Sequence, residues 1–486
     1  MSERPRKRAK HTRSRLGCRV CRIRRIRCDN THPACVKCSS TGRQCEWFQD
    51  DSSTSWALRP SPSARSSDDP LENRSLQYFR RNTVYHFASC TKNWFWTRLI
   101  LQVADREPCV RYGIVALGSL HEAFQDEHFS NSRLFPHETP SGQYAWKCYT
   151  KAVGLLRERI DRESWQGVDV ALLCCLLCVG FEWLRGCYVA AETHLRGGLS
   201  VLDQWTEVEQ SKEGRLSPSS PTGQLIREQI APMLSRFALQ AQTFMATPVP
   251  WTALIVGEHQ IVPSPDLKRA RDELYNLLSQ SYTNTCISQH SNTLFTTRRR
   301  KCAWLSRKLS EWYSIHACLL GVGTCEGISL LISYTLIKIM VESSVSTDEM
   351  QFDCFRPQFR LIVDLVETLA TSGPSKLDVD IEMVPVLYYV VVKCRHPLIR
   401  RKAISLLVAC PRREGLWDGI CTARITQYIV DIEEEGLRSI AEEQDVVAAA
   451  RVCRFCVWTD FDGRKSWVKF KRQGEQNWNK ERVLLW

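Results

Sequence analysis

Six cysteines near the N-terminus have the spacing of metal ligands. The unit C-x2-C-x6-C occurs twice within 28 residues, with its sulfurs at Cys18, Cys21, Cys28, Cys35, Cys38 and Cys45. Zn²⁺ in structural sites takes four tetrahedral ligands. Six thiolates therefore fill one site with two left over, or fill two sites that share two sulfurs. The repeat favours two Zn²⁺ ions, with the first cysteine of each half, Cys18 and Cys35, as the shared ligands.

This interpretation assigns every cysteine of the segment to an ion. One Zn²⁺ takes Cys18, Cys21, Cys28 and Cys35, and the other takes Cys18, Cys35, Cys38 and Cys45. Metal binding supplies folding free energy that so short and polar a segment cannot obtain from a hydrophobic core. The alternatives are a disulfide-bonded fold, which needs an oxidising compartment, and a zinc fold with no nucleic-acid partner. No apolar signal segment follows Met1, so a reducing compartment is expected.

The positive charge of the chain is concentrated at the same end. Residues 1–48 hold fourteen Lys and Arg against three acidic residues, so they carry +11 of the formal net charge of +13. A polyanion is therefore the expected partner of this end. The run Arg4–Arg15 is typical of a nuclear localisation signal or of an arm that binds phosphates.

The arginines after Cys21 are expected to lie on a short helix. Ile23 and Ile26 fall three residues apart, on one face, and are predicted to cover the metal cluster. Arginine forms bidentate hydrogen bonds to guanine in the major groove of DNA. The predicted base contacts are Arg24, Arg25 and Arg27. The predicted phosphate contacts, which position the protein without reading sequence, are Arg22, Lys37 and Arg43.

The segment resembles the Zn(II)2Cys6 binuclear cluster of fungal transcription factors. The six cysteines, their sharing pattern, Pro33 and the basic residues between the second and third cysteines all match. One position departs from the family, because Arg25 stands where a lysine is usual. The resemblance implies two zinc ions, recognition of CGG-type triplets in double-stranded DNA, and a nuclear regulator of transcription by RNA polymerase II.

The sequence divides into four parts. We expect a basic arm over residues 1–17, the metal-dependent DNA-binding domain over 18–45, a disordered linker over 46–72 and a helical regulatory domain over 73–486. The linker prediction rests on the Ser, Asp and Pro content of residues 49–72, which is too poor in apolar residues to pack. No heptad repeat follows the cysteines, so the oligomeric state is open, with a homodimer as one compatible state.

Residues 73–486 are predicted to be mainly α-helical with a C-terminal β-hairpin. Apolar side chains recur at helical spacing in three stripes, which begin at Leu76, Tyr144 and Ile425. The apolar run Val170–Phe181 has twelve residues. A bilayer needs about 20, so a buried helix is expected rather than a membrane span. Residues 211–224 are predicted to form an exposed loop, and residues 457–471 a hairpin that turns at Asp462-Gly463.

Two stretches resemble the fungal-specific transcription factor region found in some zinc-cluster proteins, many of which act in secondary metabolism. They are Phe95–Phe124 and Lys393–Gly419, and the resemblance covers most of residues 73–450. It implies a regulatory domain that contacts the transcription machinery or coregulators.

No catalytic motif is present, so an enzyme is not expected. Several remaining features are interpreted as structural rather than functional. Cysteines beyond residue 48, including Cys453 and Cys456, are expected to pack as small apolar groups. His86, His121 and His194 are expected to be ordinary hydrogen-bonded histidines, and the acidic run Asp431–Glu435 to be a solvated helix face.

The leading hypothesis is a zinc-dependent, sequence-specific DNA-binding transcription factor that regulates a fungal metabolic gene cluster. The alternative is a zinc or redox sensor whose DNA binding is incidental. The regular repeat favours the first hypothesis, because a sensor needs a thiolate that is easily released.

Overall fold

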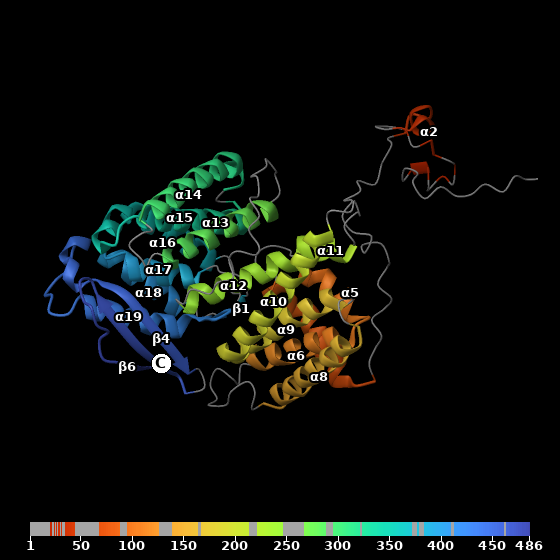
Figure 1. Ribbon diagram of the computed structural model, residues 1–486, viewed down its shortest axis with the longest axis horizontal. Helices are drawn as coiled ribbons and strands as arrows, with labels where there is room; N and C mark the ends of the chain where they lie inside the picture. The colour runs from red at the N-terminus through yellow and green to blue at the C-terminus, as the bar shows by residue number, and fades with distance from the viewer. Residues whose placement is uncertain are drawn as a thin grey trace, which may run out of the picture. The chain divides into compact units, whose positions relative to one another are not determined.

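The structure is a computed structural model, and it divides into two compact units, Met1–Pro60 and Ser61–Trp486 (Figure 1). The residues that it describes are 20–21, 24, 26, 28–29, 31, 35–43, 68–87, 95–125, 139–163, 167–212, 221–245, 267–287, 295–320, 323–371, 377–378, 383–409, 413–460 and 463–486. The sequence prediction of a small cysteine-rich domain followed by a large helical one is confirmed.

The first half of the second unit is a bundle of helices. Asp69 caps the first of them, because its carboxylate accepts a 2.9 Å hydrogen bond from the Leu71 amide, and Pro70 occupies the first helical position. The helices are α3 (Pro70–Tyr78), η1 (Phe79–Thr83), α4 (Val84–Phe87), η2 (Phe95–Leu99), α5 (Ile100–Ala104), α6 (Pro108–Gln125), α8 (Pro140–Glu163), α9 (Val168–Arg185), α10 (Tyr188–Lys212), α11 (Pro221–Leu225), η5 (Ile226–Ile230) and α12 (Ala231–Met245).

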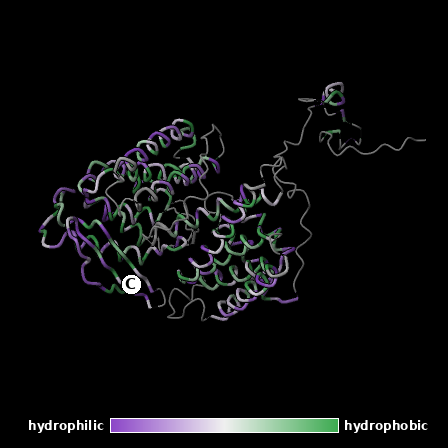
Figure 2. Tube along the Cα trace, viewed as in Figure 1, coloured by the Kyte–Doolittle hydropathy of each residue, from purple (hydrophilic) through white to green (hydrophobic). Residues whose placement is uncertain are grey.

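Helix α9 is the buried centre of this bundle. The run Val170–Phe181 lies within it, and nearly all its side chains are buried between α6 and α10, as predicted. Figure 2 shows hydrophobic segments along the helices of this bundle. The helix ends at Gly186, whose φ of 76° is a left-handed conformation that glycine adopts without strain. Among the described residues, no helix is both long enough and apolar enough to cross a bilayer.

The second half continues with helices that share the same core. Thr324 caps α15 by accepting a 3.0 Å hydrogen bond from the Gly327 amide, and Asp418 caps α19 in the same way through Cys421. The helices are α13 (Leu267–Ile287), α14 (Phe295–His316), η8 (Ala317–Leu319), α15 (Cys325–Ser343), η9 (Glu349–Phe355), α16 (Arg356–Thr371), α17 (Val384–Lys393), α18 (Pro397–Ala409), α19 (Gly419–Glu433), η10 (Glu443–Asp445) and η11 (Ala448–Ala450).

A small sheet ties the two halves together. Its strands are β1 (Leu377–Asp378), β2 (Arg413–Glu414) and β3 (Trp417–Asp418). Arg413 donates a 3.0 Å hydrogen bond to the carbonyl of Leu184 at the end of α9. Tyr188, at the start of α10, donates to the carbonyl of Leu416 at 3.2 Å. The last third of the chain therefore closes over the helix at the centre of the first bundle.

The predicted C-terminal hairpin is confirmed and is longer than expected. Strand β4 (Val452–Asp460) pairs antiparallel with β5 (Lys465–Arg472). A third strand, β6 (Arg482–Leu485), pairs antiparallel with β5 and was not predicted. One face of this sheet packs on α19, where Phe470 and Val452 join the core of that helix.

The acidic run Asp431–Glu435 is not wholly a solvated face, so that prediction is wrong for its central residue. Glu433 is buried and accepts hydrogen bonds from Arg395 at 2.9 Å and Arg400 at 2.6 Å. The Val452 amide donates to the same carboxylate at 2.6 Å. These bonds replace the water that a carboxylate loses on burial.

The predicted loop over residues 211–224 is partly helical. Helix α10 extends to Lys212, and α11 begins at Pro221. Proline is favoured in the first turn of a helix because its missing amide hydrogen has no helical partner there. The stripes that begin at Leu76, Tyr144 and Ile425 all lie on helices and turn largely inward, as predicted.

Candidate metal centre and nucleic-acid interface

The described residues of the first unit place the second cysteine of each repeat on a helical turn. Cys21 follows Val20 in one turn, closed by a 3.1 Å bond from the Arg24 amide to the Val20 carbonyl. Cys38 lies on α2 (Val36–Ser39), which begins directly after Cys35. Equivalent positions of the two halves therefore have similar local structure, which is what an internal repeat predicts.

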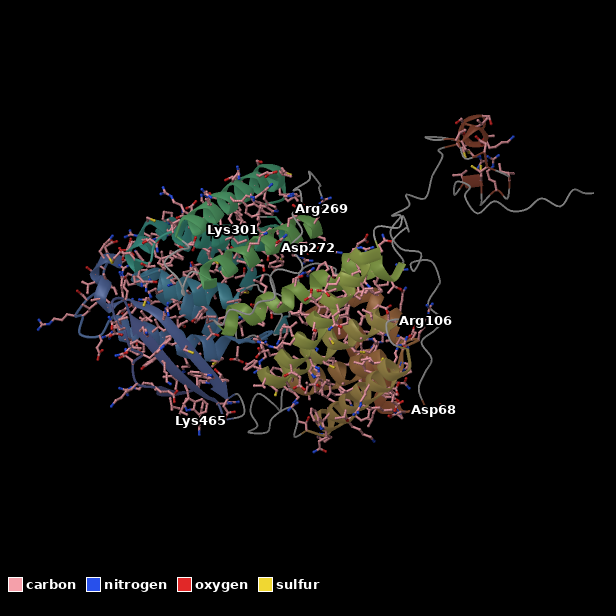
Figure 3. The ribbon with its side chains drawn as sticks, in the orientation of Figure 1. Asp68, Arg106, Arg269, Asp272, Lys301 and Lys465 are labelled. Carbon is pink, nitrogen blue, oxygen red and sulfur yellow. The ribbon has the colours of Figure 1, made fainter. Side chains whose placement is uncertain are left out.

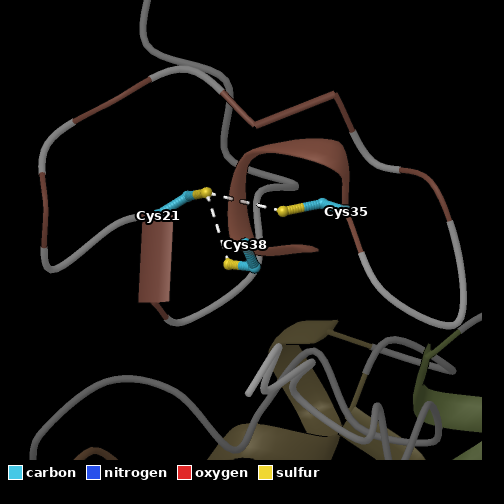
Figure 4. A group of neighbouring side chains, drawn as sticks. All are labelled: Cys21, Cys35 and Cys38. Atoms are coloured by element: carbon cyan, nitrogen blue, oxygen red, sulfur yellow. Dashed lines mark hydrogen bonds between the residues drawn. The ribbon is translucent and has the colours of Figure 1, made fainter. Parts of the chain in front are cut away.

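Three sulfurs from the two halves of the repeat meet at one centre (Figure 4). The Cys21 Sγ lies 3.6 Å from the Cys35 Sγ and 3.9 Å from the Cys38 Sγ, and all three residues are buried. Zn–S bonds of about 2.3 Å at tetrahedral angles place the sulfurs about 3.8 Å apart. The three sulfurs thus have the mutual separation of thiolates around one tetrahedral ion.

Cys28 brings a fourth sulfur to the same centre. The ligand atoms of Cys28, Asp29 and Cys35 lie within 4.8 Å of one another, as do those of Cys21, Cys35 and Cys38. Cys35 belongs to both groups, which suits a shared ligand. The predicted partition puts Cys21 and Cys38 on different ions, whereas their sulfurs are close here. Cys18 and Cys45, which complete both sites, lie outside the described residues, so the partition stays a prediction.

Asp29 has a role that the sequence interpretation missed. Its carboxylate accepts a 3.1 Å hydrogen bond from the Val36 amide at the start of α2, and a second bond from the Thr31 hydroxyl. The Thr31 bond and then the Val36 bond lower the pKa of Asp29 to about 2. Asp29 therefore fixes the chain after Cys28 to the helix that carries Cys38. An acidic residue beside a ligand in a strongly basic segment is the signal for this role.

Arg24 is turned toward the second half of the repeat. Its Nη1 donates to the carbonyl of Lys37 at 3.3 Å and to the hydroxyl of Thr41 at 3.2 Å. These bonds join the first helical turn to the end of α2, so Arg24 has a positioning role besides its predicted base contact. Sequence reasoning did not anticipate that role.

The other predicted DNA contacts divide into two groups. Lys37 and Arg43 are exposed, as phosphate contacts require. Arg22, Arg25 and Arg27 lie outside the described residues, and so does Ile23. Ile26 is 39% exposed, so it covers the cluster less completely than predicted. Its amide bonds to the Cys21 carbonyl, five residues back, and this wider turn departs from the regular helix on which the prediction relied.

Most histidines and cysteines of the second unit that the structure describes are buried or half-buried, as expected, but Cys318 and Cys354 are exposed, so the prediction is wrong for these two. His121 Nδ1 lies 2.9 Å from the Thr83 hydroxyl, and His194 Nε2 lies 2.7 Å from the Tyr149 hydroxyl. Burial lowers the pKa of His194. Cys453 donates to the Lys471 carbonyl at 3.4 Å. The side chain of His86 lies outside the described residues.

One further group of ligand-type side chains comes together in the second unit. Ligand atoms of His396, Glu442 and Glu443 lie within 4.8 Å of one another. Arg356 donates to both glutamates, including a 2.9 Å bond from its Nε to Glu443. Because the Arg356 guanidinium already binds both carboxylates, an ion-pair network accounts for them.

Two family models match the chain. Residues 16–55 match the fungal Zn(2)-Cys(6) binuclear cluster domain, and residues 74–240 match the fungal specific transcription factor domain. The second match begins in α3 and ends in α12, so it includes Phe95–Phe124. Lys393–Gly419 lies beyond it, and the matched region is therefore smaller than the resemblance over 73–450 suggested.

Curated relatives are similar over parts of the chain. The aspercryptin biosynthesis cluster-specific transcription regulator atnN of Emericella nidulans is 27% identical over 238 residues, which are 42% of this chain and 37% of that protein. The transcription regulator lscL of Purpureocillium lilacinum is 26% identical over 207 residues, 38% of this chain and 48% of the relative. The transcription factor lfc1 of Flammulina velutipes is 50% identical over 42 residues, 9% of this chain and 15% of the relative.

The matched region thus spans less than half the length of each of these relatives. No solved structure matches the chain. Both matched domains are transcription-factor domains, and neither is an enzyme domain. The cysteine repeat, the converging sulfurs and the two domain matches together show that the chain carries a fungal Zn(2)-Cys(6) binuclear cluster domain and a fungal specific transcription factor domain, and that it is similar to fungal transcription regulators.

Proposed function

We propose that the first unit binds two Zn²⁺ ions through its six cysteines and presents basic side chains to double-stranded DNA. The observation that carries this proposal is the convergence of Cys21, Cys35 and Cys38 at sulfur separations of 3.6 and 3.9 Å. Such close packing of soft ligands suits zinc. When bound, the ions cross-link the two halves and supply the folding free energy of the unit.

Cys18 and Cys35 are the proposed shared ligands. Cys21 and Cys28 complete one site, and Cys38 and Cys45 complete the other. Asp29 orients the loop after Cys28 without serving as a ligand, because its carboxylate already accepts bonds from Thr31 and Val36. Hydrogen bonds of this kind outside the ligand set commonly fix metal-site geometry.

The DNA contacts follow from the position of the basic residues. Arg24, Arg25 and Arg27 are proposed to face base edges in the major groove, at CGG-type half-sites. Arg22, Lys37 and Arg43 are proposed to bind phosphates. The exposure of Lys37 and Arg43 supports their part of this assignment.

The proposed setting is the nucleus, with transcription by RNA polymerase II as the regulated process. The proposed domain boundaries are a basic arm to residue 17, the cluster to 45, a linker that ends at 69 rather than 72 because α3 begins at Pro70, and a regulatory region to 486. That region is proposed to contact coregulators. The similarity to a cluster-specific regulator supports a metabolic gene cluster as the target.

A redox sensor is less well supported. Cys21, Cys28, Cys35 and Cys38 are all buried, whereas a sensing thiolate is accessible to its oxidant.

Metal analysis combined with DNA binding tests the proposal. The full chain should contain two zinc atoms, and Cys28→Ala should lose at least one of them together with specific binding. A randomised duplex library then separates the contacts. Arg25→Ala should cost about 1–3 kcal/mol and relax the sequence preference, while Lys37→Ala should weaken all duplexes alike. One zinc atom per chain, or specific binding by the zinc-free protein, would refute the proposal.

A further inference from the structure

The C-terminal sheet has one face that packs on the core and one that does not. The side chains toward α19 are mostly apolar and include Phe455, Val457, Phe470 and Leu484. Strand residues alternate between the two faces of a sheet. The outward positions are therefore Arg454, Cys456, Trp458, Asp460, Lys465, Trp467, Lys469, Lys471, Val483 and Leu485, which we call the outer sheet face.

Large aromatic side chains are exposed on this face. Trp458 on β4 and Trp467 on β5 are directly paired across the two strands; Trp458 is 52% exposed and Trp467 is half-buried. Val483 pairs with Trp467 on its other side. Trp478, in the connection before β6, is 44% exposed. Exposed aromatic residues gathered at one place usually mark a binding surface rather than a packing requirement.

Lysines alternate with these aromatic rings. Along β5 the outward residues are Lys465, Trp467, Lys469 and Lys471, and Figure 3 shows Lys465 at the hairpin end of the sheet. The Lys469 Nζ lies 5.5 Å from the centre of the Trp458 ring. The Lys471 Nζ lies 5.4 Å from the centre of the Trp478 ring. These contacts hold the ammonium groups beside the indoles.

The face has an excess of positive charge. Four of its residues are basic, namely Arg454, Lys465, Lys469 and Lys471, against a single acidic residue, Asp460. The Asp460 carboxylate accepts a 3.0 Å hydrogen bond from the Gly463 amide in the hairpin turn. Glu481 lies at the margin, 3.4 Å from Lys469. The outer sheet face therefore presents flat aromatic rings that alternate with positively charged side chains.

We propose that the outer sheet face binds single-stranded nucleic acid. Unpaired bases stack on aromatic side chains, and neighbouring Lys and Arg bind the backbone phosphates. Successive outward residues of a strand are about 6.6–6.8 Å apart, which suits an extended nucleotide chain. The two indoles paired across β4 and β5 provide stacking surfaces for consecutive bases.

This site is distinct from the one proposed for duplex DNA. A base pair inside a duplex exposes only its edges in the grooves, so it has no π surface available for Trp458 or Trp467. An acidic peptide would match the charge but would leave the stacking surfaces unused. The combination of charge and indoles therefore favours a nucleic-acid strand over a peptide.

Fluorescence anisotropy of the full, zinc-loaded chain with labelled oligo(dT) and oligo(U) tests the proposal. Unlabelled duplex is added to saturate the first unit. Trp458→Ala and Trp467→Ala should each weaken oligonucleotide binding about tenfold, and Trp458→Phe should recover most of the loss. Lys469→Gln should reduce the slope of log K against log salt by about 0.7.

Trp146→Ala is the matched control. Trp146 is also 44% exposed and has a cation over its ring, since Arg185 Cζ lies 4.5 Å from the ring centre, but it lies on α8. Its replacement should leave oligonucleotide binding unchanged. Circular dichroism of each variant checks that the sheet has folded.

Several outcomes would overturn the proposal. One is an equal loss of oligonucleotide affinity in Trp146→Ala and Trp458→Ala. Another is unchanged oligonucleotide binding in both Trp458→Ala and Trp467→Ala. A third is displacement of the labelled oligonucleotide by an acidic peptide at a concentration equal to or lower than that of the oligonucleotide. Duplex affinity is measured in parallel. It should be the same in Trp458→Ala as in the parent chain, so failure of this site is distinguishable from failure of the zinc-dependent site.

Discussion

At the scale of single residues, the first unit relies on a few polar bonds between its two halves. Asp29 joins the Cys28 segment to α2, and Arg24 joins the first helical turn to the other end of α2. Both residues constrain segments that carry metal-ligating cysteines. Positioning bonds of this kind orient ligands and so affect metal affinity without touching the ion.

Replacing Arg24 by alanine should weaken zinc retention as well as DNA binding. The variant loses the bonds to Lys37 and Thr41, and because these are largely exposed, the expected cost is about 1 kcal/mol. Transfer of zinc from the full chain to a chelator measures the effect. Arg43→Ala, which removes an exposed arginine of the same unit, is the control. Identical zinc retention in the two variants would show that Arg24 has no role in zinc binding and acts only in the proposed DNA contact.

Glu433 is the buried carboxylate that Arg395 and Arg400 share. Burial alone would raise the pKa of this carboxyl, but Arg395 and then Arg400 outweigh that effect and lower it to about 2. Glu433→Gln leaves two buried guanidinium groups without their shared anion, so we expect a loss of about 3–5 kcal/mol in unfolding free energy. Denaturant unfolding measures this loss.

The acidic run supplies its own control. Glu435 is exposed and bonds only at 3.3 Å to Arg472, so Glu435→Gln should change stability by less than about 0.5 kcal/mol. The pH dependence follows from the lowered pKa of Glu433. Its contribution is complete above the ordinary value of 4.5 and is lost as the pH falls toward about 2. A Glu433→Gln variant as stable as Glu435→Gln would contradict this role.

The site was predictable from sequence to different degrees. Cysteine spacing identifies ligands because few other functions need sulfur at fixed short intervals. Asp29 and Glu433 were not identified, for a common reason. An acidic residue has the same local sequence whether it is solvated or paired. The Val36 amide lies 7 residues from Asp29 along the chain, and Arg400 lies 33 residues from Glu433. Only the fold brings these partners together.

At the scale of elements, the bundle depends on close approach of helix backbones. A Cβ atom added at Gly118 on α6 would lie 2.4 Å from the carbonyl oxygen of Ser75 on α3. Backbone atoms cannot move aside as a flexible side chain does, so the two helices would have to separate. Stripes of apolar residues predicted these helices. They did not predict which face of α6 would approach the backbone of α3 so closely.

Gly118→Ala should therefore destabilise the second unit by about 1–3 kcal/mol. Gly154→Ala is the matched change, because Gly154 lies on α8 with no atom within 4 Å of the added Cβ. That variant should be neutral or stabilised by up to about 1 kcal/mol, since alanine favours the helix. Thermal unfolding followed by circular dichroism compares the two. A Gly118→Ala chain as stable as the parent would show that α3 and α6 adjust freely.

At the scale of the whole molecule, the chain consists of two units stabilised by different interactions. The first is held by cysteines and a few hydrogen bonds, and the second by a hydrophobic core that extends through its helices. The composition of the sequence predicted this division. Residues 1–48 are basic and cysteine-rich, whereas apolar residues at helical spacing begin near residue 73. The third strand of the sheet escaped prediction because β6 has only four residues.

Removal of zinc should therefore affect one unit only. A strong chelator should abolish duplex binding, yet leave the thermal unfolding midpoint of the helical unit within about 1–2 °C of the zinc-loaded value. Circular dichroism and a duplex-binding assay on the same sample measure both effects. Cooperative loss of helix on chelation would show instead that the two units depend on each other.

The bond between Tyr188 and Leu416 also bears on how the protein is made. Its partners are 228 positions apart along the chain, and Arg413 and Leu184 are 229 positions apart. Ribosomes add roughly 5–20 residues per second, so the centre of the bundle waits roughly ten to fifty seconds for its last partner to emerge. During that interval the nascent chain exposes apolar surface and becomes a natural client for chaperones. Alleles that stop translation before residue 413 should accordingly aggregate rather than yield a shortened regulator.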